Sequence, residues 1–138
     1  MLELRTSSWW YIAGALAVLL YVVVCVAYFY PLQAWYVRNT IAPQIERDLG
    51  FEARSVQTNP RFTERTLVIT SVAPTGPSVR AGLRVGDRPF DFHGHSEISF
   101  YENLEHSRGS TALVRVSRLD PNADIPRLLE VRVFVPKR

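Results

Sequence analysis

The chain has 138 residues, with 16 lysines and arginines against 13 aspartates and glutamates and a formal net charge of +3. These charges are interspersed, so the sequence lacks the clustered basic patch that is typical of nucleic-acid-binding proteins. Cys25 is the single cysteine, which excludes an intramolecular disulfide framework and a cysteine-rich metal site. About thirty residues belong to an apolar N-terminal segment, and the roughly one hundred that remain suffice for one small folded domain.

The first expected element is a transmembrane helix over residues 9–30, preceded by a tail of residues 1–8. The segment contains no charged or amide side chain, and aromatic residues gather at both of its ends. As a helix it spans roughly 30 Å, which matches the hydrocarbon core of a lipid bilayer. Two alternatives are a buried core helix and a cleaved secretory signal, for which Cys25-Val26-Ala27 loosely fits a small-x-small cleavage pattern.

The charges around this helix give only a weak preference for its orientation. Arg5 precedes it and Arg38 follows it, so the excess of positive charge that marks a cytoplasmic side is barely present. A very short tail before a first apolar segment is typical of a signal anchor. We therefore expect a single-pass membrane protein whose folded domain lies outside the cytoplasm, in the periplasm if the source is a bacterium.

Residues 31–48 are expected to form a helical connector between the membrane helix and the domain. Pro31 suits the start of a helix. Pro43 removes a backbone hydrogen bond from a helix interior, unless it begins a second short helix after Asn39 or Thr40. We therefore expect a bend at this second proline and the two residues before it. The apolar residues of the connector recur at four-residue spacing: Ile41, Ile45 and Leu49.

Residues 76–87 read GPSVRAGLRVGD and predict a short helix between two turns. Pro77 fits the first helical turn, and Gly82 can adopt the left-handed conformation that ends a helix. Leu83 then reaches back into the core, and the final Gly-Asp pair turns the chain toward another strand.

Five segments have the composition or the alternation of half-buried strands. The last two alternate apolar and charged residues most clearly, so we expect them to pair as neighbours across a turn at Asp120-Pro121. The five segments are residues 51–57, 66–72, 88–92, 112–119 and 128–135.

The run Arg-Ala-Gly-Leu-x-x-Gly-Asp at residues 80–87 resembles the signature of PDZ domains, and Leu49-Gly50-Phe51 resembles part of their carboxylate-binding loop. The resemblance implies an α+β fold in which the transmembrane helix is followed, over residues 49–138, by a small PDZ-like, partly open β-barrel or sandwich with two helices. No clear strand precedes Leu49, so the arrangement is more similar to the bacterial cell-envelope type of PDZ domain.

This resemblance implies that the C-terminal carboxylate of a peptide binds the backbone N–H groups of Gly50 and Phe51. Glycine permits a loop shape there that a Cβ would hinder. Leu49 and Phe51 would wall an apolar pocket for the last side chain of the ligand. Arg47 is a candidate for a water-bridged charge contact, although a solvated cation at a helix end is the commoner role of such a residue.

The other wall of the groove is expected from a helix over residues 99–107, with Ser99 as its cap. Phe100 and Leu104 share one face of this helix. One of Phe100, Tyr101 and Leu104 is expected to face the ligand, although the same spacing serves core packing equally well. Many PDZ domains that prefer Ser or Thr in the ligand carry His at the first groove position, where this chain has Phe100 or Tyr101. This departure favours an apolar ligand.

The sequence contains no recognisable enzyme site. It has no His-Glu-x-x-His helix, no Gly-x-Ser-x-Gly turn and no phosphate-binding loop. His93 and His95 have an i, i+2 spacing, but no cysteine accompanies them, so surface histidines are favoured over zinc ligands. We therefore expect no catalytic activity, no cofactor and no bound metal.

Two functions remain open. In the first, the chain is a membrane-anchored protein-interaction module that adds an extended peptide or a C-terminus of another membrane or envelope protein as a strand to residues 51–57. In the second, it is a structural or regulatory subunit of a membrane complex, such as an envelope protease or a secretion apparatus. The groove is then unused or permanently occupied.

Overall fold

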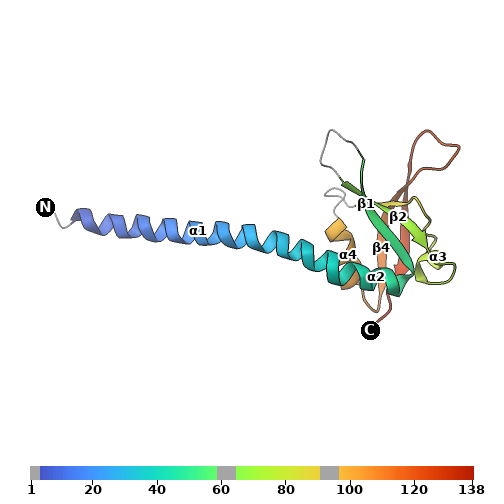
Figure 1. The fold of residues 1–138 in the computed structure, drawn as a ribbon, viewed down its shortest axis with the longest axis horizontal. Coiled ribbons are helices and arrows are strands. Elements are labelled where there is room, and N and C mark those ends of the chain that lie inside the picture. Colours follow the sequence, from blue (N-terminus) through green and yellow to red (C-terminus); the bar gives the residue numbers. More distant parts are fainter. Residues whose placement is uncertain (1–3, 59–64, 91–96) are drawn as a thin grey trace. The chain divides into compact units, whose positions relative to one another are not determined.

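The computed structural model describes residues 4–58, 65–90 and 97–138. It is an α+β structure, and the contacts within it divide the chain into two compact units, with the division between Tyr36 and Val37. Figure 1 shows the helices and strands of both units.

The first unit is formed by α1 (Leu4–Tyr36), a helix of 33 residues. Its hydropathy and length are sufficient to cross a membrane, and it starts a helical stretch that continues to Leu49. A membrane anchor and a signal sequence share these properties. Pro31 lies inside α1, so its expected place at a helix start was wrong. Proline removes one hydrogen bond from the helix interior, and the apolar residues on both sides of it still continue the helix.

The second unit starts with η1 (Val37–Ile41), a short π-helix, and α2 (Ala42–Leu49). Pro43 lies in the first turn of α2, where its missing N–H removes no helical bond. The irregularity expected beside this proline is therefore a π-helical turn, a wider turn than that of an α-helix. Asn39 and Thr40 lie inside this π-helical turn. The residue at the cap position of α2 is Ile41, which makes no side-chain cap, so neither Asn39 nor Thr40 caps the helix.

Five strands form two antiparallel sheets in the described part of the chain. One sheet pairs β1 (Phe51–Gln57) with β2 (Arg65–Val72), and the other has β4 (Thr111–Arg118) between β3 (Arg88–Pro89) and β5 (Arg127–Phe134). Of the expected partly open barrel or sandwich, the barrel form is not found, because the two sheets do not close into a barrel. The two-residue β3 is too short to continue a ladder from one sheet to the other.

Two backbone hydrogen bonds nevertheless link β2 of the first sheet to the turn that precedes β3. The N–H of Ile69 in β2 donates to the carbonyl of Asp87 at 2.9 Å, and the N–H of Gly86 donates to the carbonyl of Ile69 at 2.8 Å. The predicted Gly-Asp turn therefore lies against the edge of β2 that faces away from β1.

The short helix predicted in residues 76–87 is present as α3 (Pro77–Ala81). Gly82 ends it with φ 91°, in the left-handed region, and Leu83 is buried. The predicted helix, glycine stop and apolar plug are therefore confirmed.

Asp87 anchors this turn through its fully buried side chain. Its carboxylate accepts the N–H of Arg84 at 2.9 Å, and both Nε and Nη2 of Arg118 donate to it at 2.7 Å. The hydrogen bond to Asp87 raises the pKa of Arg118. The buried ion pair therefore connects the end of β4, which carries Arg118, to this turn.

The second long helix of this unit is α4 (Glu97–His106). It already includes Ser99, so the expected cap at that residue was wrong. Figure 1 shows α4 beside α2, and the two helices are in contact.

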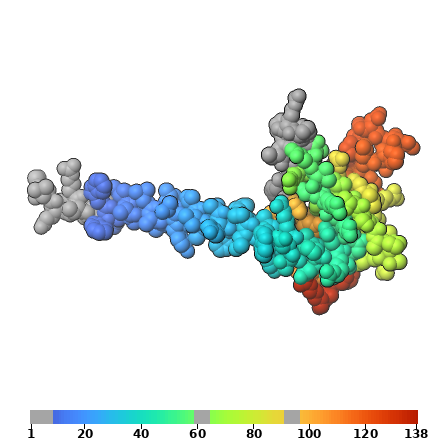
Figure 2. Space-filling model, in the orientation of Figure 1, coloured from blue at the N-terminus to red at the C-terminus, as the bar shows by residue number. Residues whose placement is uncertain are grey.

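The β4–β5 hairpin is present as predicted, with apolar side chains buried on one face and the other face exposed. The loop between its strands projects from the domain in Figure 2, and Leu119 and Ile125 are exposed there. The buried faces of both strands join a single core with residues of η1, α2, β1, β2 and α4 and with Leu83. The core residues are Val37, Ala42, Ile45, Leu49, Phe51, Leu67, Ile69, Leu83, Tyr101, Leu104, Ala112, Val114, Val116, Val131, Val133 and Val135.

Candidate functional site

The chain's own η1 and α2 pack where the sequence predicts a peptide groove, between β1 and α4. Both η1 and α2 contact α4, and α2 also contacts β1. Val37, Ile45 and Leu49 of this segment are at most 1% exposed. The η1–α2 segment (residues 37–49) is therefore an integral part of the folded unit, although we predicted residues 31–48 as a connector outside it.

Four of the seven predicted binding residues are buried, one of them in this segment and three in β1 and α4. Their exposed fractions are at most 3%, and all four belong to the one core. The sequence thus identified residues that the fold brings together in the core, and of these four residues Phe51 also borders the shallow cleft described below. Their role in peptide binding stays a prediction. The four are Leu49, Phe51, Tyr101 and Leu104.

Glu46 of α2 connects the two predicted walls of the groove. One of its carboxylate oxygens, Oε1, accepts the hydroxyl of Tyr101 in α4 at 2.5 Å and the backbone N–H of Ala53 in β1 at 3.2 Å. Burial, followed by the hydrogen bond to Glu46, raises the pKa of Tyr101 above its usual range. Tyr101 therefore keeps its proton at neutral pH and acts as the donor.

The N–H of Ala53 points away from β2, toward the edge of β1 that an added peptide would use. Gly50 accepts a hydrogen bond from Ala73 on the β2 side, and backbone groups in a strand alternate in direction. Residues 51, 53 and 55 therefore present their N–H groups to the outer edge. Ile69 is the register partner of Ala53 in β2. Its backbone N–H and carbonyl also point away from the partner strand, because both bond to the turn before β3.

Gly50 has a structural role that the sequence did not reveal. Its φ is 72°, in the left-handed region, and its N–H donates to the carbonyl of Glu46 at 2.8 Å, which ends α2. This N–H is therefore already bonded within the chain, although we expected it to bind a ligand carboxylate. A Cβ at this position would lie 3.2 Å from the Cβ of Ala73, so the loop is also closely packed.

Arg47 is exposed beside this loop. It lines a shallow cleft of about 400 Å³ together with Pro43, Gly50 and Phe51, and Glu46 and Glu52 also line this cleft. The lining of this cleft therefore combines one basic with two acidic residues. Arg47 therefore lies beside the predicted carboxylate-binding loop, as expected, but acidic residues line the same cleft.

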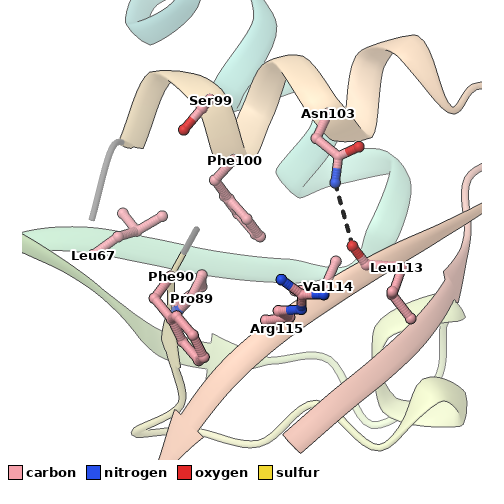
Figure 3. A pocket seen from close by; sticks show the side chains of 9 residues that line it. All are labelled: Leu67, Pro89, Phe90, Ser99, Phe100, Asn103, Leu113, Val114 and Arg115. Atoms are coloured by element: carbon pink, nitrogen blue, oxygen red, sulfur yellow. Dashed lines mark hydrogen bonds between the residues drawn. The ribbon is translucent and has the colours of Figure 1, made fainter. Parts of the chain in front are cut away.

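Phe100 of α4 contributes to two environments. Its ring meets that of Phe51 edge-on, with centroids 6.1 Å apart. It also points into a cleft of about 310 Å³ between α4, β3 and β4, where Asn103 Nδ2 donates to the carbonyl of Leu113 at 3.3 Å (Figure 3). The sequence did not predict this cleft, because it depends on how α4 crosses β4.

Two ion pairs complete the attachment of the η1–α2 segment to α4. Arg38 Nε lies 3.2 Å from Glu97 at the start of α4, and Arg108 Nη1, just after its end, lies 2.9 Å from Asp48. Arg108 also pairs with Glu105 at 2.7 Å. Burial alone would lower the pKa of Arg108, but the hydrogen bonds to Asp48 and Glu105 raise it overall. With Glu46 and Tyr101, these pairs make three polar links between the segment and α4.

The described residues contain no group of three side chains suited to hold a metal ion. His106 is on α4, with Nδ1 2.7 Å from the carbonyl of Glu102. His93 and His95 lie outside the described residues. No protein-family model matches this chain, and no curated protein matches its sequence.

Proposed function

We propose that this chain is a membrane-anchored protein-interaction module whose folded unit is a PDZ-like domain. The observation that carries the proposal is the outer edge of β1. Within the described residues no strand pairs with this edge, and a side chain, Glu46, bonds to the N–H of Ala53 there. An edge strand with free backbone groups is the surface to which an extended peptide adds.

The ligand in this proposal is an extended peptide or a C-terminus of another membrane or envelope protein. It would bond through its main chain to the outward groups of β1, and side-chain pockets would supply selectivity. The helix α1 would hold the module in the lipid bilayer, with the domain on the extracytoplasmic side.

A second candidate function is a structural or regulatory subunit of a membrane complex with a permanently occupied groove. The complete burial of Val37 and Ile45 against the domain favours it. In that case the η1–α2 segment is a constant part of the domain, and other surfaces carry the interaction.

A proline scan of the outer edge separates the two functions. Ser55→Pro removes an N–H that points away from β2, so pairing with β2 is retained. Ser55→Ala is the matched control, because it removes the side-chain hydroxyl and keeps the N–H. The full chain in detergent is screened against a library of decapeptides, and each hit is titrated by calorimetry against all three proteins.

Strand addition predicts that Ser55→Pro weakens binding about tenfold or more, as expected for a lost hydrogen bond in a desolvated edge, while Ser55→Ala binds as the wild type does. Equal binding by all three folded proteins contradicts addition to this edge. A library without hits supports the structural-subunit function.

A further inference from the structure

Glu46 accepts hydrogen bonds from both walls of the predicted groove. It belongs to the η1–α2 segment, while its two donors belong to β1 and α4. A peptide added to β1 would need the N–H of Ala53 for its own main chain. The segment therefore occupies the position of a ligand, and its carboxylate occupies the polar contacts of a ligand.

We propose that Glu46 is an internal ligand, so that the η1–α2 segment closes the groove and an external peptide with a carboxylate must displace it. This inference rests on the proposed function as a peptide-binding module. The closed form is the one described by the structure, and the open form exposes the N–H of Ala53 and the hydroxyl of Tyr101 together.

The bonds of Glu46 also define the chemistry of the external ligand. Tyr101 is buried to 1% exposure and donates its proton, so it favours an acceptor that is negatively charged. Ala53 donates a backbone N–H from the strand edge. The two donors together suit an extended peptide that places a carboxylate between β1 and α4. That carboxylate comes either from an Asp or Glu side chain or from the C-terminus.

The closed form is held at three places along α4. Glu46 bonds near its middle, while Arg38 and Asp48 pair with charges near its two ends. The pair of Arg38 is exposed on one side, with 53% of the arginine side chain accessible, and the pair of Asp48 is more buried. Apolar burial of Val37 and Ile45 adds to these links. The closed form therefore predominates, and peptide affinity is reduced by the small fraction of open molecules.

Hydrogen exchange of the full chain in detergent micelles tests the internal ligand without any peptide. Glu46→Ala removes the acceptor, Glu46→Gln keeps an oxygen without the charge, and Gln44→Ala is a control on the same helix. We expect the Ala53 amide to exchange roughly tenfold to a hundredfold faster in Glu46→Ala, the factor that corresponds to a hydrogen bond to a charged group. Glu46→Gln should show a smaller increase, and Gln44→Ala none. An unchanged Ala53 rate in folded Glu46→Ala overturns the inference.

Peptide binding then tests displacement. Three decapeptides of one extended sequence are titrated against the wild type and Glu46→Ala: one with a central Glu and an amidated end, one with a central Gln and an amidated end, and one with a central Gln and a free end. Glu46→Ala should bind a carboxylate-bearing peptide about tenfold more tightly than the wild type does. The first and third peptides distinguish a side-chain carboxylate from a terminal one.

The two experiments fail independently. Faster exchange without binding of any peptide retains the closed segment and contradicts the proposed peptide-binding function. Equal affinity of the wild type and Glu46→Ala for a peptide that does bind retains the function and overturns displacement. Addition of Tyr101→Phe to Glu46→Ala should abolish the preference for Glu over Gln, and a preserved preference would overturn the assignment of Tyr101 as its donor.

Discussion

Replacing Tyr101 with phenylalanine measures the bond between the η1–α2 segment and α4. The substitution keeps the buried ring and removes only the hydroxyl that donates to Glu46 at 2.5 Å. A hydrogen bond to a charged group contributes about 1.5 to 3 kcal/mol. Glu46 is partly exposed and keeps its bond to Ala53, so water replaces some of the lost interaction. We therefore expect the free energy of unfolding to fall by about 1 to 2 kcal/mol.

The same bond makes stability depend on pH in the alkaline range. Burial and the bond to Glu46 raise the pKa of Tyr101 in the folded state, whereas an unfolded tyrosine ionises near pH 10. Below that pH the hydrogen bond makes its full contribution to the free energy of unfolding. Above it the unfolded state loses the proton first, so the free energy of unfolding decreases as the pH rises toward the folded pKa. Tyr101→Phe should lack this contribution.

Residues 37–138 provide a clean assay, because Tyr101 is their single tyrosine and they contain no tryptophan. Tyrosinate absorbance then reports this residue alone, and urea unfolding at several pH values gives the free energies. Two results would refute the reasoning. One is ionisation near pH 10 in the folded protein, and the other is a Tyr101→Phe variant as stable as the wild type to within about 0.5 kcal/mol.

Three further predictions concern the folded unit. Residues 37–138 expressed alone should fold, since they form a compact unit, and a lack of cooperative unfolding or of a dispersed amide spectrum would contradict this boundary. Leu83→Ala should lower the free energy of urea unfolding by about 2 to 5 kcal/mol, because its side chain is buried; a loss under roughly 0.5 kcal/mol would place Leu83 at the surface. Asp87→Ala should lower it by about 3 to 5 kcal/mol, because Arg118 loses its buried partner, and Arg118→Met in the Asp87→Ala background should recover part of that loss. A loss equal to that of an exposed ion pair would show that the pair is solvated.

The elements that depend on local sequence were predicted well. The strand at residues 51–57 has the predicted bounds, and the hairpin of the last two strands forms with the expected buried face. Gly82 and Leu83 also have the predicted roles. In each case a turn residue and an alternation of apolar side chains determine the structure within about ten residues.

Helix boundaries were less accurate. The helix passes through Pro31, and α4 starts at Glu97, before the expected cap at Ser99. Neighbouring residues and tertiary contacts can outweigh the local preference of a single proline or serine. The π-helical turn at residues 37–41 has no recognisable sequence signal.

The candidate site was predicted only in part, because its decisive contacts join distant parts of the chain. Glu46 meets Tyr101 across 55 positions, and Asp48 meets Arg108 across 60. The sequence placed these two acidic residues in a connector, where solvated charges are the usual expectation. The one available signal was the position of Glu46 next to the apolar Ile45 in an amphipathic pattern. It identified a buried helical face, but not the surface that covers it.

Amide hydrogen exchange in the unmodified full chain tests the central claim most directly. Ala53 and Ser55 both direct their N–H groups to the outer edge of β1, and the N–H of Ala53 donates to the carboxylate of Glu46. If the η1–α2 segment closes this edge, the Ala53 amide should exchange at least about tenfold more slowly than the Ser55 amide. Equal exchange of the two amides at the rate of an exposed edge would contradict the claim that the chain occupies its own groove.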